Sequence, residues 1–353
     1  MPQNNEQIKR RIRESWRMQA VSAGLCTGAQ VYLLGAGIAV PLCGNSAWIA
    51  SLAAVPAAAL LAAIAGKRLA GGGASRAGLC ALALACFLLS VFSCAALVLM
   101  AEQSLLPQAQ AVRTATLTAA FVSLCASSGR GEVRLCFLIR WALPVILIGA
   151  ACLSLPRSGL HGLFPILGRS AGSLAAAAAA MTAAAVPALT IILPPQELKS
   201  LSAPDMHVPE TGFFARRAAA GALAGCAAVF LLCAGNTPEI LAKERLFGMR
   251  LLAPAGGGAH QGIFDTAVIL ALTAACALTA ARLLACAASA AQCAFAHALK
   301  GHRALIVLGA ALAAALLVFA ALGETAVPGV GLTAVLPGLC AAASGGKKRG
   351  NAS

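Results

Sequence analysis

Apolar runs of membrane-spanning length recur along the whole chain, and they constrain its fold more than any other feature. Roughly 20 apolar residues, at about 1.5 Å of rise each, cross the hydrocarbon core of a bilayer as a helix. The first such run extends from Arg17 to Pro41. Of the 353 residues, 60% are hydrophobic and only 10% are charged, whereas soluble domains carry about 25% charged residues. The chain is therefore predicted to be an all-α polytopic membrane protein.

Ten apolar segments are long enough to span, and polar or glycine-rich loops separate them. The predicted spans are residues 17–41, 46–66, 78–101, 109–127, 135–155, 170–193, 218–235, 263–287, 304–322 and 326–343. They form one transmembrane domain between a basic N-terminal segment, residues 1–16, and a basic tail, residues 344–353. Ile8, Ile12 and Trp16 recur four residues apart, so the N-terminal segment is predicted to form a short interfacial helix.

The net charge of +15 follows this topology. With both termini in the cytoplasm, and with Arg17 and Arg113 counted in the segments that they adjoin, 18 Lys and Arg residues fall in cytoplasmic segments, six fall outside, and two lie within spans, which accounts for all 26. The positive-inside rule requires such an excess in cytoplasmic loops. Because the basic residues gather at helix ends rather than on one face, we expect no nucleic-acid partner. The expected partner of the spans is membrane lipid.

The residue types that carry metal binding or catalysis are poorly placed for either. The 14 cysteines form no Cys-x-x-Cys pair and lie mostly inside apolar runs, where we interpret them as small filling residues. The histidines fall in loops or near a helix end without a second ligand at metal spacing. No nucleophile–base pair, phosphate-binding loop or pair of carboxylates lies within a span. We therefore expect no metal, no cofactor and no enzymatic activity.

The first span contains a stretch that is unusual at hydrocarbon depth. Residues 27–30 read Thr-Gly-Ala-Gln, and a glycine weakens a helix interior by about 1 kcal/mol relative to alanine. Backbone groups freed at this depth must be buried in protein or line a cavity, so the stretch predicts a break that faces a solute. The alternative is that Gly28 only permits close helix packing. Gly35 and Gly37, nearer the outer end, rank second as the position of the break.

The sixth span is also interrupted, at residues 182–187. Pro187 removes one backbone hydrogen bond and clashes with a carbonyl one turn back, so it kinks or breaks the helix. The first and sixth spans begin two five-helix halves of opposite orientation. Corresponding breaks in two halves are typical of a transporter-type binding site, so we predict a 5+5 inverted-repeat fold with broken first and sixth helices.

Several short motifs occur in an order and at a spacing that resemble one family. They are Asn45–Ile49, Leu105–Pro107, Gly129–Arg134, Leu163–Gly168, Phe264–Asp265 and Leu336–Gly338, followed by the basic tail. Over nearly its whole length the chain resembles the B subunits of bacterial spore germinant receptors, the spore-germination permease branch of the amino acid–polyamine–organocation superfamily. Ile263 stands where the family has an arginine, and Val186-Pro187-Ala188 stands where members often have a glutamate.

The resemblance implies ten helices in an inverted-repeat transporter fold. It also implies a membrane subunit that binds a small germinant, often an amino acid, and works with A and C partner subunits. The expected location is the bacterial cell membrane or the spore inner membrane. The missing glutamate bears on proton or cation coupling and on the ligand charge that the site prefers.

The candidate ligand site combines the two breaks with the helices that flank them in this family. From the breaks come Thr27, Gly28, Ala29 and Gln30, with Ala183, Val186 and Pro187 opposite. The resemblance adds Ser90 and Ser93 from the third span and Thr273 and Cys276 from the eighth. The alternative for Ser90, Ser93 and Thr273 is a hydrogen bond to a carbonyl one turn back. Arg140 and Arg282 lie within spans and are expected to snorkel to the membrane surface.

Three functions are compatible with the sequence. The first is a germinant-receptor subunit that senses a ligand. The second is an amino-acid permease of the same superfamily with real substrate flux. The third is a structural membrane scaffold whose pocket is filled by alanine. The alanine-rich sixth span and the missing acid favour the first or third function over the second.

Overall fold

The computed structural model describes residues 2–70, 75–100, 111–128, 134, 136, 139, 170–193, 210–234, 261–295, 302–322 and 327–344. Every regular element in these ranges is a helix, and six helices are long and apolar enough to cross a membrane. This confirms the prediction of an all-α polytopic membrane protein. The predicted fifth span lies almost entirely outside the described residues, as do the motifs at 105–107 and 163–168.

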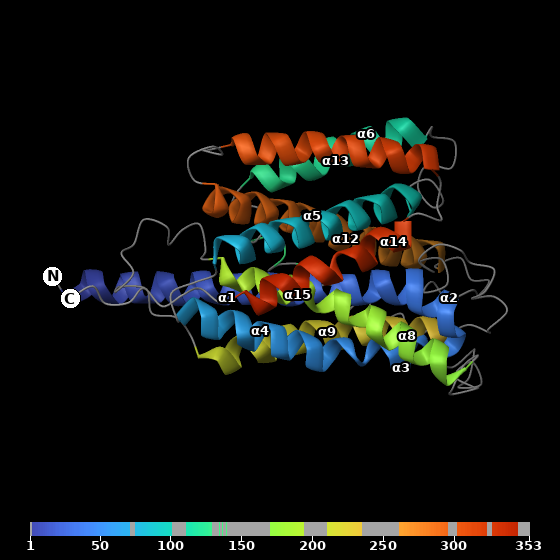
Figure 1. The fold of residues 1–353 in the computed structure, drawn as a ribbon, viewed down its shortest axis with the longest axis horizontal. Coiled ribbons are helices and arrows are strands. Elements are labelled where there is room, and N and C mark those ends of the chain that lie inside the picture. The colour runs from blue at the N-terminus through green and yellow to red at the C-terminus, as the bar shows by residue number, and fades with distance from the viewer. Residues whose placement is uncertain are drawn as a thin grey trace.

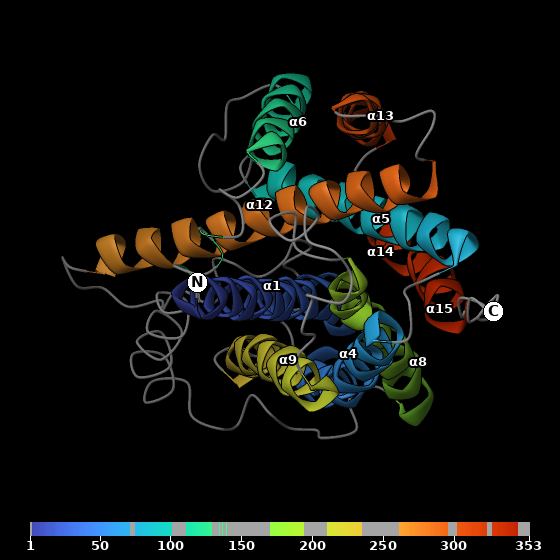
Figure 2. The same ribbon diagram turned by 90° about the vertical axis from the view of Figure 1, so that its left-hand side faces the viewer.

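Most of the described helices run along the long axis of an elongated bundle (Figure 1), whereas α12 is strongly tilted to that axis (Figure 2). In chain order they are α1 (Pro2–Leu34), a π-helix η1 (Gly35–Ala39), α2 (Val40–Cys43), a 3₁₀-helix η2 (Gly44–Ser46), α3 (Ala47–Ser51), α4 (Ala54–Ala70), α5 (Arg76–Met100), α6 (Ala111–Ser127), α8 (Ala171–Met181), a 3₁₀-helix η5 (Thr182–Ile192), α9 (Thr211–Ala234), α12 (Gln261–Ala294), α13 (Arg303–Leu322), α14 (Val327–Thr333) and α15 (Val335–Ala343). Seen along the bundle, α1 is central, with α12 on one side and α9 and α4 on the other (Figure 2).

One end of the bundle collects most of the described basic residues, and we refer to it as the basic end. Helices α1, α5, α9 and α13 begin there, and α4, α12 and α15 end there (Figure 1). Its basic residues include Arg10, Arg11, Arg13, Arg17, Lys67, Arg68, Arg76, Arg216, Arg217 and Arg303. The Arg68 guanidinium donates to the carbonyls of Ala341 and Ser344 at 2.8 and 2.6 Å and also to that of Ala342, so it caps the end of α15.

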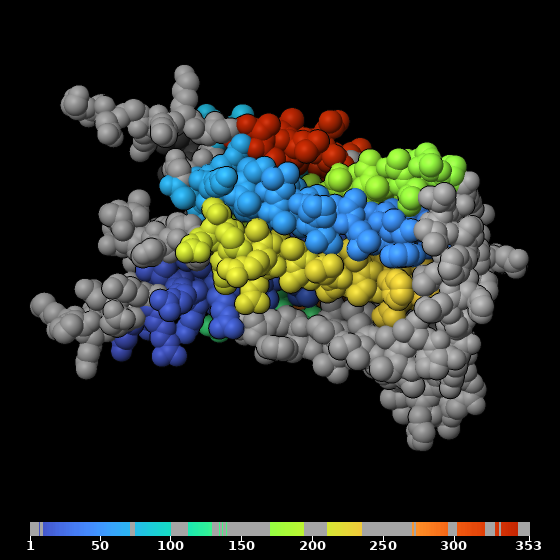
Figure 3. All heavy atoms as spheres, turned by 90° about the horizontal axis from the view of Figure 1, so that it is seen from below, coloured from blue at the N-terminus to red at the C-terminus, as the bar shows by residue number. Residues whose placement is uncertain are grey.

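The outer faces of the bundle are strongly apolar. Helices α4 and α9 lie side by side along one face (Figure 3), and α6 packs with α13 at the opposite margin (Figure 2). On these margins Leu117, Leu124 and Ile306 are 67%, 70% and 68% exposed. So much exposed apolar surface on long apolar helices indicates lipid contact, and the protein is an integral membrane protein.

The first span is not broken where the sequence predicted. Helix α1 is one α-helix from Pro2 to Leu34, so it runs through residues 27–30 without interruption and includes the N-terminal segment. A Cβ atom placed on Gly28 would lie 2.5 Å from the carbonyl oxygen of Gly221 on α9. Gly28 therefore permits close packing between two helices, which was the alternative interpretation. The helix departs from α geometry only at Gly35–Ala39, which contains the second-ranked candidates, Gly35 and Gly37.

The sixth span is interrupted as the sequence predicted. Ser170 and Ser173 form a capping box at the start of α8, which leads into a run of alanines with high helix propensity. At Thr182 the α-helix changes to the 3₁₀-helix η5, which continues through Pro187 to Ile192. A 3₁₀ run longer than about four residues is uncommon, and within a helix it often marks a hinge. Pro187 cannot donate to a ladder and disfavours α geometry in the preceding turn.

Candidate functional site

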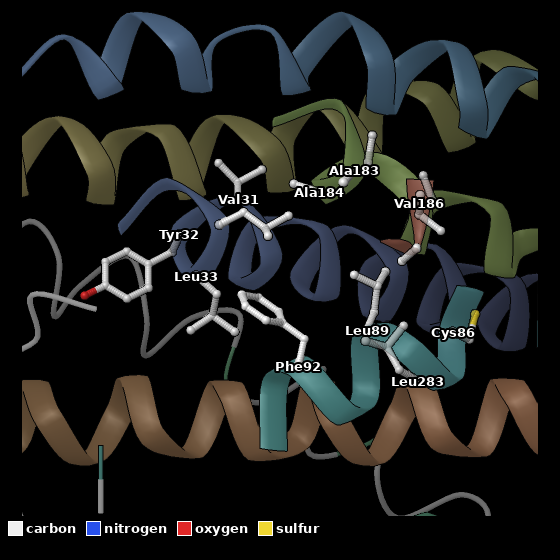
Figure 4. Close-up of a cluster of buried hydrophobic side chains, with 14 of the residues drawn as sticks. Val31, Tyr32, Leu33, Cys86, Leu89, Phe92, Ala183, Ala184, Val186 and Leu283 are labelled. Carbon is white, nitrogen blue, oxygen red and sulfur yellow. The ribbon is translucent and has the colours of Figure 1, made fainter. Parts of the chain in front are cut away.

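Four helices meet at the centre of the bundle, and they belong to the first, third, sixth and eighth predicted spans. They are α1, α5, η5 and α12; α1 and α5 pack against each other, and each of them also packs against η5 and α12. Leu89 and Phe92 of α5 point toward α1 and η5, where Val186 lies opposite them (Figure 4). All three side chains are buried, at 3% exposure or less. The space that these helices surround is therefore occupied by apolar side chains in this conformation.

A buried amide joins α1 to α5. The side-chain amide of Gln30 donates to Ser93 Oγ at 2.5 Å, and the Ser93 hydroxyl donates to the carbonyl of Leu89 at 2.8 Å. Gln30 and Ser93 are both fully buried. The Gln30 Oε1 atom has no hydrogen-bond partner among the described residues. An unpaired buried acceptor costs about 1–3 kcal/mol, so Oε1 is a place where an added donor would be stabilising.

The neighbouring serine of α5 forms a contact to the eighth span. The Ser90 hydroxyl donates to the carbonyl of Ala280 on α12 at 2.9 Å. Ser90 therefore bridges two helices, whereas Ser93 bonds one turn back, as its alternative interpretation predicted. Thr27 also bonds one turn back, to the carbonyl of Ala23 at 2.8 Å. Its hydroxyl is thereby committed to its own helix.

Near the basic end a second buried amide joins α1 to both η5 and α12. Gln19 donates through Nε2 to the carbonyls of Thr190 and Leu193 at 3.2 and 3.3 Å. Arg282 of α12 donates through Nη2 to Gln19 Oε1. Arg282 is only 8% exposed, so the prediction that it snorkels to the surface is wrong. Its partner in the bundle interior replaces the water it would find at the surface, and such an intramembrane charge indicates a functional position.

We refer to Gln19, Gln30, Ser90, Ser93 and Arg282 as the core polar residues. Sequence reasoning missed Gln19, which lies two residues after Arg17 in the predicted first span and was not singled out. A usable signal was its spacing from Gln30. Eleven residues are about three helical turns, so the two glutamines share one face of α1. Together the core polar residues form hydrogen bonds that connect all four central helices.

The remaining predicted site residues lie in three other places: in η5, on α12 and around a cavity beside α9. Ala183, Val186 and Pro187 are buried in η5, and Val186 also packs against Gly338 of α15. Thr273 is half-buried on α12, two turns before Ala280. Gly28, Ala29 and Cys276 line a cavity on the other side of α1 from Gln30. The structure thus separates the predicted site into a polar part at α5 and α12 and an apolar part at α9.

The cavity lies between α1, α9 and α12 and has a volume of about 50 Å³. Its lining residues are Leu25, Gly28, Ala29 and Tyr32 of α1, Gly221, Ala224, Gly225 and Ala228 of α9, and Ala275 and Cys276 of α12. The surface that they present is apolar. Within the described ranges, no group of three or more His, Cys, Asp or Glu side chains lies close enough to hold a metal ion.

Comparison with known proteins does not assign the chain. No protein-family model matches it, and no curated protein matches it either. The resemblance to germinant-receptor subunits therefore stays a prediction.

Proposed function

We propose that the protein is a transporter-like membrane subunit of a germinant receptor, which binds a small nutrient molecule and signals through A and C partner subunits. The observation that carries this proposal is the set of hydrogen bonds among the core polar residues. They connect the four spans nominated as the ligand site, and polar groups inside a membrane bundle are costly to bury and commonly mark functional sites. The ligand that the resemblance favours is an amino acid.

The proposal includes a ten-span, 5+5 inverted-repeat topology. Helices α1 and α8–η5 run in opposite directions (Figure 1), and each departs from α geometry, at Gly35–Ala39 and at Thr182–Ile192. Paired irregularities in antiparallel spans support a repeat of that kind. By the positive-inside rule, the basic end faces the cytoplasm. Both termini then lie on the cytoplasmic side of the cell membrane or spore inner membrane.

Gln30 is the residue that we assign to ligand contact. Its unpaired Oε1 accepts a hydrogen bond from a ligand N–H or O–H group, and its Nε2 is already held by Ser93. Fixing one end of an amide in this way orients the other end, which lowers the entropic cost of binding. Leu89, Phe92 and Val186 occupy the adjacent space, so ligand entry requires η5 or α1 to move away from α5.

The hydrogen bonds of Gln19 couple a movement of η5 away from α5 to the positions of α1 and α12. They hold the end of η5, at Thr190 and Leu193, against α1 and, through Arg282, against α12. A ligand that binds better when η5 is displaced shifts the population toward that state, and a partner subunit that contacts the moved helix senses the shift. The germinant signal is then a change in the position of η5.

Purified protein in proteoliposomes tests the proposal, with a mixture of radiolabelled amino acids as the probe. We expect saturable binding without accumulation in the lumen. Gln30→Leu abolishes binding, because it removes both the acceptor and the donor to Ser93. Gln7→Leu, an exposed change on the same helix, is the matched control and leaves binding unchanged. Absence of binding to the unmodified protein, or full binding to Gln30→Leu, would contradict the assignment, and accumulation would indicate a permease.

A further inference from the structure

The cavity between α1, α9 and α12 has a structural cause. Gly24 and Gly28 on α1 face Gly221 and Gly225 on α9, and both pairs are four residues apart, as in the small-xxx-small contacts of membrane helices. The two backbones touch at these glycines. Three residues after each of these α9 glycines lie Ala224 and Ala228, whose short side chains leave part of the space beside the contact open. The close glycine contact therefore produces an open volume beside it.

The chemistry of the cavity excludes a polar occupant. The lining consists of glycine and alanine surface together with Leu25, Tyr32 and Cys276, and its surface is apolar. A buried water needs two to four polar partners, and an apolar cavity stays dry. An apolar ligand gains about 25 cal/mol for each Å² of apolar surface that it buries. The cavity accordingly selects for hydrocarbon.

The depth of the cavity in the bundle indicates which part of a lipid molecule lies beside it. The Arg217 guanidinium of α9 lies 5.7 Å from the Phe213 ring centroid, one turn back toward the basic end, as expected of a side chain that reaches for the membrane interface. Gly221 and Ala228 follow Arg217 by four and eleven residues, or about 6 and 16 Å of helix rise. A hydrocarbon core of about 30 Å places that interval between the headgroup side of one leaflet and the midplane.

We place the opening of the cavity at its less buried lining residues. Leu25, Gly221 and Ala224, which line it, are half-buried, whereas Gly28, Ala29 and Cys276 behind them are buried. Leu223, the residue before Ala224 on α9, is 52% exposed. A molecule that enters from this side comes from the acyl-chain region of the bilayer.

We propose that this cavity binds the distal end of a lipid acyl chain. The chain end lies against Gly28 and Ala29 of α1, Ala224 and Ala228 of α9, and Cys276 of α12. Because it contacts both sides of the glycine seam, a bound chain stabilises the contact between α1 and α9. This site stands independently of the solute site, which lies on the opposite side of α1.

Photolabelling in nanodiscs tests the proposal. One phosphatidylcholine carries a diazirine at the end of an acyl chain, and a second carries it next to the glycerol. We expect the chain-end probe to label peptides that contain Tyr32, Ala224 or Cys276, and the glycerol-side probe to label none of these. Mass spectrometry of the digested protein gives the labelled positions.

Three variants make the result specific. Ala224→Leu closes the opening and loses the chain-end labelling, whereas Ala220→Leu, an exposed change one turn earlier on α9, retains it. Leu25→Ala widens the opening and raises labelling, so the site is tested in both directions even if one variant folds poorly. Equal labelling by both probes, labelling unchanged in Ala224→Leu and Leu25→Ala, or the same loss in Ala220→Leu would overturn the proposal.

Discussion

Replacing Gly28 by alanine tests the central packing feature of the structure, the contact between α1 and α9. A Cβ atom at position 28 would lie 2.5 Å from the carbonyl oxygen of Gly221 and 3.2 Å from its carbonyl carbon. Both are backbone atoms, so no side-chain rotation relieves the clash. Ordinary contact begins at 3.4 Å, and the two helices must therefore separate by the difference between 2.5 and 3.4 Å.

Two opposing effects set the change in the free energy of unfolding for Gly28→Ala. Overpacking of this kind typically costs about 1–3 kcal/mol. Replacing a glycine by alanine in a helix interior stabilises the helix by about 1 kcal/mol. The steric cost is larger, so we expect Gly28→Ala to lower the free energy of unfolding by about 1 kcal/mol, and by up to about 2 kcal/mol if the helices resist separation. Gly212→Ala on α9 is the matched control, because a Cβ there meets nothing within 4 Å.

Equilibrium unfolding in mixed detergent–SDS micelles, followed by tryptophan fluorescence, measures the effect. Trp16 of α1 is fully buried and lies edge-on to Phe214 of α9, with ring centroids 5.8 Å apart, so its emission reports on this interface. Trp48 and Trp141 are replaced by phenylalanine in every variant to isolate that signal. If Gly28→Ala is as stable as the parent or gains stability, the two helices do not touch at Gly28. The case for a broken first helix would then return.

Two further predictions concern polar contacts. Gln19→Leu removes the acceptor of Arg282 and the donor to Thr190 and Leu193, so we expect a loss of about 1–3 kcal/mol. The double variant with Arg282→Met should recover part of that loss in the same unfolding assay, and strictly additive losses would refute coupling between the two side chains. Arg68→Ala uncaps the end of α15, so hydrogen exchange should accelerate there, while Lys67→Ala, its neighbour in the last turn of α4, leaves the exchange rate unchanged. Equal exchange in both variants would show that Arg68 does not hold α15.

The sequence by itself determined the features that depend on a residue's own segment. Apolar length predicted the spans and the membrane class, because spanning is a property of one helix in lipid. The basic residues at helix ends predicted the basic end. Pro187 predicted the interruption of the sixth span correctly, since its ring acts on its own helix whatever surrounds it.

Tertiary structure decided the meaning of residues whose effect depends on a neighbour. A glycine lacks a Cβ, and only the presence of Gly221 on a distant helix shows that Gly28 permits contact rather than a break. Gln19 and Arg282 are 263 residues apart, so no local pattern joined them. The sequence nominated the four spans that meet at the centre of the bundle. The division of the candidate site between the two faces of α1 depended on the rotation of that helix within the bundle, and packing sets that rotation.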